Sequence, residues 1–197
     1  MKCHRPAGQV TTVNLSHRPA GQVTTHNRNP PRRGTEIYGG NMANYIKELR
    51  SVIGHRPIIY GAGSIIVENE RGEVLLGKRT DNHLWGYSGG GMEIGESVEE
   101  TAKRELREEM GIEADELTFF MVNSGPESYI KYPNGDEVYY VEVIFRCGKY
   151  HGEPKRQPEE LEELRFFKPE EITLDMISPP IRPVFRKYLT ERGVKTE

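Results

Sequence analysis

The chain has 197 residues, of which 35% are hydrophobic and 29% charged, and its formal net charge is −3. This composition is typical of a globular protein, and no apolar stretch approaches the roughly 18 residues that a membrane-spanning helix needs. Because the N-terminus also lacks the apolar segment of a secretory signal, we expect a cytosolic protein with no membrane partner. Cys3 and Cys147 are too few and too far apart for a disulfide framework or a zinc site, so both are expected to be free thiols.

Residues 1–41 differ from the rest of the chain in composition. They contain six of the 27 Lys and Arg residues but only one of the 30 acids, and the segment HRPAGQVTT occurs twice, at 4–12 and 17–25. Two copies cannot bury a core as a repeat protein does. We therefore expect a flexible basic leader at 1–41, derived from cloning or mistranslation with a native start at Met42, and one domain at 42–197. A nucleic-acid-binding arm or a transit peptide is the alternative.

From Met42 onward, regular elements are predicted in chain order. Apolar residues at helical spacing predict a helix over about 46–53, which Gly54 and Pro57 end. Asn134 and Gly135 are a strong hairpin signal within the turn between two later strands. The other predicted elements are strands at 57–67, 73–79, 115–123, 137–147 and 164–167, a loop at 80–96, and helices at about 97–110 and 181–191. Strands that mix hairpins with intervening helices indicate an α/β domain with a mixed sheet.

The predicted helix at 97–110 is well bounded and carries an unusual cluster of acids. Ser97 and Glu100 form a capping-box pattern, and Gly111 stands where a helix commonly ends. At about 100° per residue, Glu105, Glu108 and Glu109 share an arc of roughly 100° beside the apolar stripe; the residues of that stripe are Val98, Ala102, Leu106 and Met110. Carboxylates this close repel each other, and a hard divalent cation such as Mg²⁺ or Mn²⁺ would relieve that repulsion.

A solvated acidic face is the ordinary interpretation of such a helix, but the residues before it favour a ligand site. Gly89, Gly90 and Gly91 allow the backbone to approach a ligand closely, so that a main-chain carbonyl can join a metal shell. Glu96 precedes the helix and Arg104 lies within it, and an ion pair between them would fix the loop against the helix.

The stretch 90–112 resembles the Nudix box, G-x5-E-x7-R-E-U-x-E-E-x-G-U with U aliphatic. It matches at every specified position: Gly90, Glu96, Arg104, Glu105, Leu106, Glu108, Glu109, Gly111 and Ile112. The likeness extends more weakly over about 58–176. One departure is Ser88, where many relatives carry Pro before the paired glycines.

The resemblance implies a Nudix-type α/β/α sandwich and a metal-dependent hydrolase that cleaves a pyrophosphate linkage. By this carry-over, Glu105, Glu108 and Glu109 bind Mg²⁺ or Mn²⁺ with the help of the Gly90 carbonyl, and Glu96 with Arg104 supports the site. The catalytic base is Glu105 or a later glutamate, for which Glu160 is the candidate and a surface acidic cluster the plainer interpretation.

Substrate recognition is much less determined by the sequence. Several aromatic residues outside the box are candidates to stack on a base, and Arg79 is a candidate to contact a phosphate, although packing or surface exposure is the ordinary role of each. These aromatic residues are Tyr87, Tyr129, Tyr132 and Tyr139. We expect Trp85 to anchor its loop and His83 to be solvated.

Three functions fit these patterns. The leading one is hydrolysis of a small nucleotide: ADP-ribose, a nucleotide sugar, a dinucleoside polyphosphate or a nucleoside triphosphate. A second is a nucleotide-sensing module that keeps the fold without the reaction, which the complete set of box glutamates disfavours. A third is decapping of RNA ends, against which the acidic balance of residues 42–197 argues. A homodimer is compatible with the sequence, which does not fix the oligomeric state.

Overall fold

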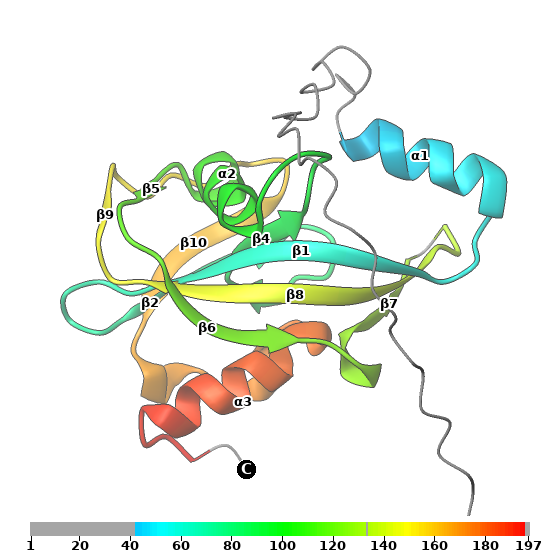
Figure 1. The fold of residues 1–197 in the computed structure, drawn as a ribbon. Coiled ribbons are helices and arrows are strands. Elements are labelled where there is room, and N and C mark those ends of the chain that lie inside the picture. Colours follow the sequence, from blue (N-terminus) through cyan, green and yellow to red (C-terminus); the bar gives the residue numbers. More distant parts are fainter. Residues whose placement is uncertain (1–41, 133, 196–197) are drawn as a thin grey trace, which may run out of the picture. The chain divides into compact units, whose positions relative to one another are not determined.

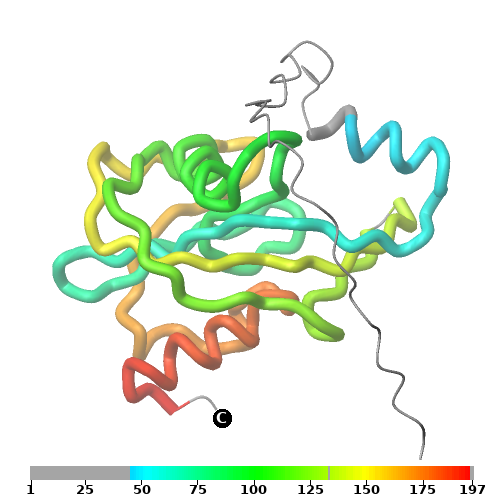
Figure 2. The backbone as a smooth tube through the Cα atoms, in the orientation of Figure 1, coloured from blue at the N-terminus to red at the C-terminus, as the bar shows by residue number. Residues whose placement is uncertain are grey.

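The computed structural model describes residues 42–132 and 134–195, and it shows a mixed sheet with helices on its faces (Figures 1 and 2). The predicted leader at 1–41, with its duplicated segment and Cys3, lies outside the described residues. The α-helices are α1 (Met42–Ile53), α2 (Val98–Met110) and α3 (Arg182–Glu191). Within the described residues, none of the helices is long and apolar enough to cross a membrane.

The central sheet has the strand order β4-β1-β8-β6, with β7 also paired to β8. Strands β1 (Ile58–Val67) and β8 (Glu137–Cys147) run parallel over their whole length and lie side by side in Figure 2. The antiparallel partners are β4 (Ser88–Gly91), β6 (Thr118–Asn123) and β7 (Tyr129–Lys131). The parallel pair confirms that the sheet is mixed.

Two smaller sheets complete the strands. One has the order β10-β2-β3 and is antiparallel throughout. The other is a single antiparallel pair of two-residue strands. Their members are β2 (Val74–Arg79), β3 (Trp85–Gly86), β5 (Glu113–Ala114), β9 (Tyr150–His151) and β10 (Leu161–Phe167). Short 3₁₀ turns connect the late elements at Pro126–Ser128, Pro169–Glu171, Leu174–Met176 and Pro179–Ile181.

The two faces of the central sheet are covered by different helices, because side chains alternate along each strand. On one face, Ile65 of β1 packs with Ala102 and Leu106 of α2. On the other, Ile66 packs with Val184 and Phe185 of α3. Figure 1 shows α2 and α3 on opposite sides of β1 and β8. This arrangement confirms the α/β/α sandwich.

Helix α2 sits close to β1 because Gly63 has no side chain. A Cβ at Gly63 would fall 2.3 Å from the carbonyl oxygen of Val98, far inside van der Waals contact. Helix α1 is held differently, by polar contacts of Arg50 with the carbonyl oxygen of Glu137 at 2.9 Å and with the Asp136 carboxylate at 3.4 Å. The position of the acidic helix is therefore set by backbone packing on the central sheet.

Most elements predicted from the sequence are present, and the structure adds the short strands β3, β4, β5, β7 and β9, which were not predicted. The predicted loop at 80–96 contains β3 and β4, whose sequences WG and SGGG are too short and too rich in glycine to show strand periodicity. The predicted Asn134–Gly135 turn is present, and it joins β8 to the unpredicted strand β7 rather than directly to β6. Cys147 is a buried free thiol, as expected.

Candidate active site

Helix α2 is stabilised at both ends as the sequence predicts. Ser97 accepts a hydrogen bond from the Glu100 amide while Glu100 accepts one from the Ser97 amide, so the capping box is complete. At the other end Gly111 takes the left-handed conformation, with φ of 70°. The apolar stripe is buried: Ala102, Leu106 and Met110 are at most 1% exposed. The acids of this helix therefore project from a rigid support.

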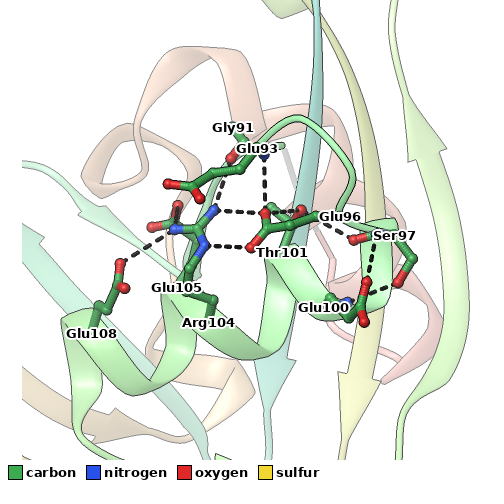
Figure 3. A network of polar contacts seen from close by, with 9 residues as sticks. All are labelled: Gly91, Glu93, Glu96, Ser97, Glu100, Thr101, Arg104, Glu105 and Glu108. Carbon is green, nitrogen blue, oxygen red and sulfur yellow. Dashed lines mark hydrogen bonds and ion pairs between the residues drawn. The ribbon is translucent and has the colours of Figure 1, made fainter. Parts of the chain in front are cut away.

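Arg104 joins the helix to the loop that precedes it (Figure 3). Its Nε donates to Glu96 Oε1 at 2.8 Å, and its Nη2 donates to the Gly91 carbonyl oxygen at 3.0 Å. Glu96 also accepts from the Thr101 hydroxyl at 2.8 Å and from the Glu93 amide at 3.0 Å. The Arg104 guanidinium, with these other donors, lowers the pKa of Glu96 to about 2. The predicted Glu96–Arg104 ion pair is present, and it fixes the loop.

Strand β4 passes directly over the carboxylates of α2. A Cβ at Gly90 would fall 2.4 Å from Glu105 Oε1, so any larger residue at this position would displace the Glu105 carboxylate. The Gly89 amide donates to Glu109 Oε2 at 3.2 Å. The backbone of β4 and two of the predicted metal ligands therefore form one surface.

The three box glutamates differ sharply in environment. Glu109 is 5% exposed, and burial, followed by the charges of Glu105 and Glu160, raises its pKa to about 8. Burial also raises the pKa of Glu105, although Arg104 donates to it at 2.7 Å. Glu108 has a side chain 58% exposed and accepts from Arg104 at 3.2 Å. Glu105 and Glu109 thus form an acidic pair in which Glu109 is buried and Glu105 is half-buried, while Glu108 lies at its edge.

This donor set fits a divalent cation that keeps part of its shell for substrate. Within residues 42–132 and 134–195, no three His, Cys, Asp or Glu side chains are gathered closely enough to hold an ion by themselves. Mg²⁺ typically takes only one or two carboxylates and fills the remaining positions with water and phosphate oxygens. A cation beside Glu105 and Glu109 would remove the cost of burying two like charges, whose raised pKa values reflect that cost. The residues present therefore suit Mg²⁺ or Mn²⁺.

The acidic pair opens into a cleft of about 670 Å³. Arg79 and Asp81 line this cleft and form a bidentate ion pair at 3.0 and 2.9 Å. Lys131 and Glu160 also line it. A cleft of this size suits a small ligand. It brings carboxylates, cations and aromatic rings together from distant parts of the chain.

A family model described as the NUDIX domain matches residues 60–188. The chain belongs to the Nudix family. It is therefore a hydrolase that acts on phosphoanhydride bonds. Nucleoside triphosphatase NudI of Escherichia coli and of Shigella flexneri is 31% identical over 138 residues, which is 66% of this chain and 93% of NudI.

Solved Nudix structures agree with the fold. The MutT NUDIX hydrolase from Burkholderia pseudomallei is 26% identical, with a TM-score of 0.53 over 68% of this chain and 97% of that chain. A MutT protein from Bacillus halodurans is 27% identical, with a TM-score of 0.53 over 66% of this chain and 82% of that chain. The arrangement of the helices and the mixed sheet is thus a known Nudix architecture.

The aromatic candidates named from the sequence divide into two groups. Tyr87, Tyr129 and Tyr132 line the Nudix cleft. Tyr139 does not line it; this residue is exposed on β8, and its ring lies tilted against that of Tyr129 with centroids 5.0 Å apart. Trp85 packs edge-on against Phe167 at 4.6 Å, which agrees with an anchoring role.

His83 and Ser88, two further residues noted in the sequence, differ in exposure. His83 has φ of 60° and contacts the carboxylate of Glu162, with 69% of its side chain exposed. Ser88, which replaces the proline of many relatives, is fully buried on β4 opposite Ile65. Serine there keeps a backbone amide that proline would lack.

Two buried polar residues of the cleft were not found by sequence reasoning. Asn123 is 3% exposed at the end of β6, and Glu142 is 8% exposed within β8. Each lines the cleft, and the two are cross-strand partners. A single acid inside the apolar run YYVEVIF was the available signal, since a lone carboxylate in such a strand requires a specific partner.

Proposed function

We propose that this Nudix hydrolase cleaves a nucleoside triphosphate with the help of Mg²⁺ or Mn²⁺. The observation that carries the proposal is the acidic pair of half-buried Glu105 and buried Glu109 beside the glycines of β4, in the lining of a cleft that also contains Arg79 and Lys131. The likeness to NudI, named a nucleoside triphosphatase, supports this substrate class over the others considered.

The proposed ligands are Glu105 and Glu109 with the Gly90 carbonyl, and Glu108 at the edge of the site. When bound, a divalent cation neutralises phosphate charge and lowers the pKa of a coordinated water. Arg79 and Lys131 would add positive charge along the phosphates, which helps to offset the acidity of the cleft. Glu96 and Arg104 would hold β4 and α2 in register for these contacts.

Hydrolysis adds water across one phosphoanhydride bond. The water oxygen forms a bond to phosphorus, the bond from phosphorus to the bridging oxygen breaks, and a carboxylate accepts the water proton. Glu105 is the proposed base, and Glu160 is the alternative. Glu160 lies in the same cleft, where its charge helps to raise the pKa values of both Glu105 and Glu109.

The test is turnover of the four ribonucleoside and four deoxyribonucleoside triphosphates with Mg²⁺ or Mn²⁺, with products identified by mass. ADP-ribose, a nucleotide sugar, a dinucleoside polyphosphate and capped RNA are the competing substrates in the same assay. We expect the highest kcat/KM on a nucleoside triphosphate and its loss on chelation, with the melting temperature still well defined. A higher kcat/KM on a competing substrate, or undiminished turnover after chelation, would refute the proposal.

The two candidate bases are separated by a pair of isosteric variants. We expect Glu105→Gln to lower kcat by at least about 10²-fold, the scale on which loss of a preorganised catalytic group is felt. Glu160→Gln should retain most of the turnover. The reverse result would assign the base to Glu160. Binding of Mn²⁺ by both variants, measured by calorimetry, shows whether the lost rate reflects the proton or the metal.

A further inference from the structure

Asn123 and Glu142 form a second polar group in the cleft, on strands other than those that carry the Nudix box. They come from β6 and β8 and face each other in the antiparallel register. Both lie on the face of the central sheet that α3 covers, together with Ser64 of β1 and Tyr87. Neither residue is needed to hold phosphate or metal in the proposed reaction.

The orientation of the Asn123 amide is fixed by its partners. Its Nδ2 donates to the Pro180 carbonyl oxygen at 2.9 Å and to Glu142 Oε2 at 3.3 Å. A proline carbonyl only accepts hydrogen bonds, so the NH₂ group must point toward it. The amide oxygen Oδ1 therefore points away from both partners. Within the described residues, no group donates to Oδ1.

Glu142 is held by neutral donors. Ser64 Oγ donates to Oε1 at 2.6 Å, and the Tyr87 hydroxyl donates to Oε2 at 3.1 Å. Burial raises the pKa of Glu142, and the bonds from Ser64, Asn123 and Tyr87 act against that rise. No cation contacts this carboxylate among residues 42–132 and 134–195, so its burial adds little stability that an apolar residue would not supply. What the network does achieve is to fix the Asn123 amide with both known contacts on Nδ2, which leaves Oδ1 available as an acceptor.

The network is also tied to the catalytic side of the cleft. A Cβ at Gly89 would fall 1.8 Å from Ser64 Oγ, so the box strand lies directly against the residue that holds Glu142. Tyr87 stacks on Phe185 of α3 with ring centroids 5.7 Å apart, which limits its movement. The amide acceptor and the acidic pair are therefore held by one continuous set of contacts.

We propose that Asn123 Oδ1 accepts a hydrogen bond from an N–H on the base of the nucleotide, and that Glu142 is a positioning residue that keeps this acceptor oriented. This inference rests on the proposed function. A phosphate is excluded as the partner, because an acceptor beside a carboxylate repels an anion. Tyr129 and Tyr132 line the same cleft and supply aromatic surface on which a base can stack. Asn123 is thus a specificity-determining residue.

The test compares each nucleoside triphosphate with a congener that lacks one base N–H donor. The pairs are ATP with purine riboside triphosphate, GTP with inosine triphosphate, UTP with N3-methyluridine triphosphate, and CTP with pyrimidin-2-one riboside triphosphate. For the preferred base, we expect the wild type to favour the donor-bearing nucleotide by about 10- to 100-fold in kcat/KM, since a bound base that lacks the N–H covers the Asn123 acceptor and leaves it unpaired. Asn123→Ala should bring that ratio close to unity, with turnover of the congener retained.

Glu142→Gln tests the positioning role, because glutamine keeps the size but removes an acceptor oxygen that Asn123 uses. We expect the ratio to fall in this variant as well. The matched control is Glu68→Gln. Glu68 is also 8% exposed and also sits in a polar network, with Arg146 and Tyr188, but it does not line the cleft. Glu68→Gln should lower the melting temperature and leave the ratio unchanged.

Binding of α,β- and β,γ-methylene analogues of the same pairs, measured by calorimetry, separates this inference from the proposed function. If the wild type hydrolyses no nucleoside triphosphate but binds with an Asn123-dependent base preference, the proposed function fails and the inference stands. The inference is overturned if Asn123→Ala keeps the wild-type ratio of kcat/KM between each nucleotide and its congener. It is also overturned if Asn123→Ala lowers kcat/KM equally on every nucleotide and congener. The inference is likewise overturned if Asn123→Ala changes the kcat/KM ratio of ATP to dATP instead, because Asn123 would then contact the ribose 2′-hydroxyl.

Discussion

The two polar groups that line the cleft differ in how far apart their residues lie in the sequence. The acidic side comes from one continuous stretch, in which β4 and α2 are joined by a short loop and locked by Arg104 and Glu96. The second polar group of the cleft, the amide side, takes Asn123 from β6 and Glu142 from β8, with Pro180 from a 3₁₀ turn near the C-terminus. A local stretch can encode its geometry through caps and helical spacing, whereas the second group exists only once the sheet has formed.

This difference suggests that the two groups have separate roles, one in turnover and one in the choice of nucleotide, and experiments can test that separation. If the acidic side carries the reaction and the amide side carries selection, variants of the first should lower turnover on every nucleotide equally. Variants of the second should change the ratio between nucleotides. A base-dependent loss from an acidic-side variant would show that the two sides are not separable.

The largest effect is expected from Glu109→Gln, which keeps size but removes a buried charge. We expect turnover with Mg²⁺ to fall by at least about 10²-fold, the scale expected when part of a preorganised electrostatic site is lost. The control is Glu99→Gln, an exposed acid in the first turn of the same helix. The measurement is steady-state kcat with Mg²⁺ for both variants. Wild-type turnover in Glu109→Gln would show that Glu109 is not a ligand of the catalytic metal.

The pH dependence of the free energy of unfolding, measured in chelator-treated protein, tests whether Glu109 is a buried carboxyl group that lacks a cation. Burial and the neighbouring charges raise the pKa of Glu109 in the folded state from an ordinary 4.5 to about 8. A raised acid pKa means that the folded state binds the extra proton, so this contribution to stability is complete below pH 4.5 and is lost as pH rises toward 8. The slope approaches about 1.4 kcal/mol per pH unit.

The free energy of unfolding, measured by urea denaturation between pH 5 and 8, checks this expectation. Glu109→Gln should show a shallower fall over the same range, because the amide does not titrate. At pH 8 without metal, the variant is expected to be the more stable of the two proteins. Parallel curves for wild type and variant would show that Glu109 is already ionised in the metal-free fold.

Arg104→Lys should have a smaller effect, since it keeps the charge while losing the planar fork that reaches Glu96 and the Gly91 carbonyl together. We expect turnover to fall about tenfold as β4 loses its fixed position over α2, with about 1 to 3 kcal/mol lost from the free energy of unfolding. Arg107→Lys, at an exposed position of the same helix, is the matched control. Equal effects from both variants would contradict the locking role of Arg104.

The acidic side was predictable because its determinants are local. Ser97 and Glu100 mark the start of α2, and helical geometry alone places Glu105 and Glu109 on nearly one face. The sequence did not distinguish the exposed Glu108 from its buried neighbour, because burial depends on how β4 crosses the helix. That crossing brings Gly90 against the Glu105 carboxylate, a contact that the sequence does not show.

The amide side was not predictable because its contacts join residues far apart in the chain. Asn123 and Glu142 became partners only through the antiparallel register of β6 and β8, and a shift of one residue would turn each side chain to the other face. The alternation in β8 indicated a strand but not its neighbours. The third partner, the Pro180 carbonyl, has no side-chain signature at all.

The smallest effect is expected from removing residues 1–41. The residues assigned to the cleft lie between 62 and 181, and the family match covers 60–188, so both sides of the cleft remain within a chain that begins at Met42. We expect unchanged kcat/KM, an unchanged base ratio and a melting temperature that does not shift. Full-length and shortened proteins, assayed side by side in the nucleotide panel and by calorimetry, provide the measurement. A loss of turnover on every nucleotide would mean that the leader supports the acidic side, whereas a change in base ratio alone would mean that it contributes to selection.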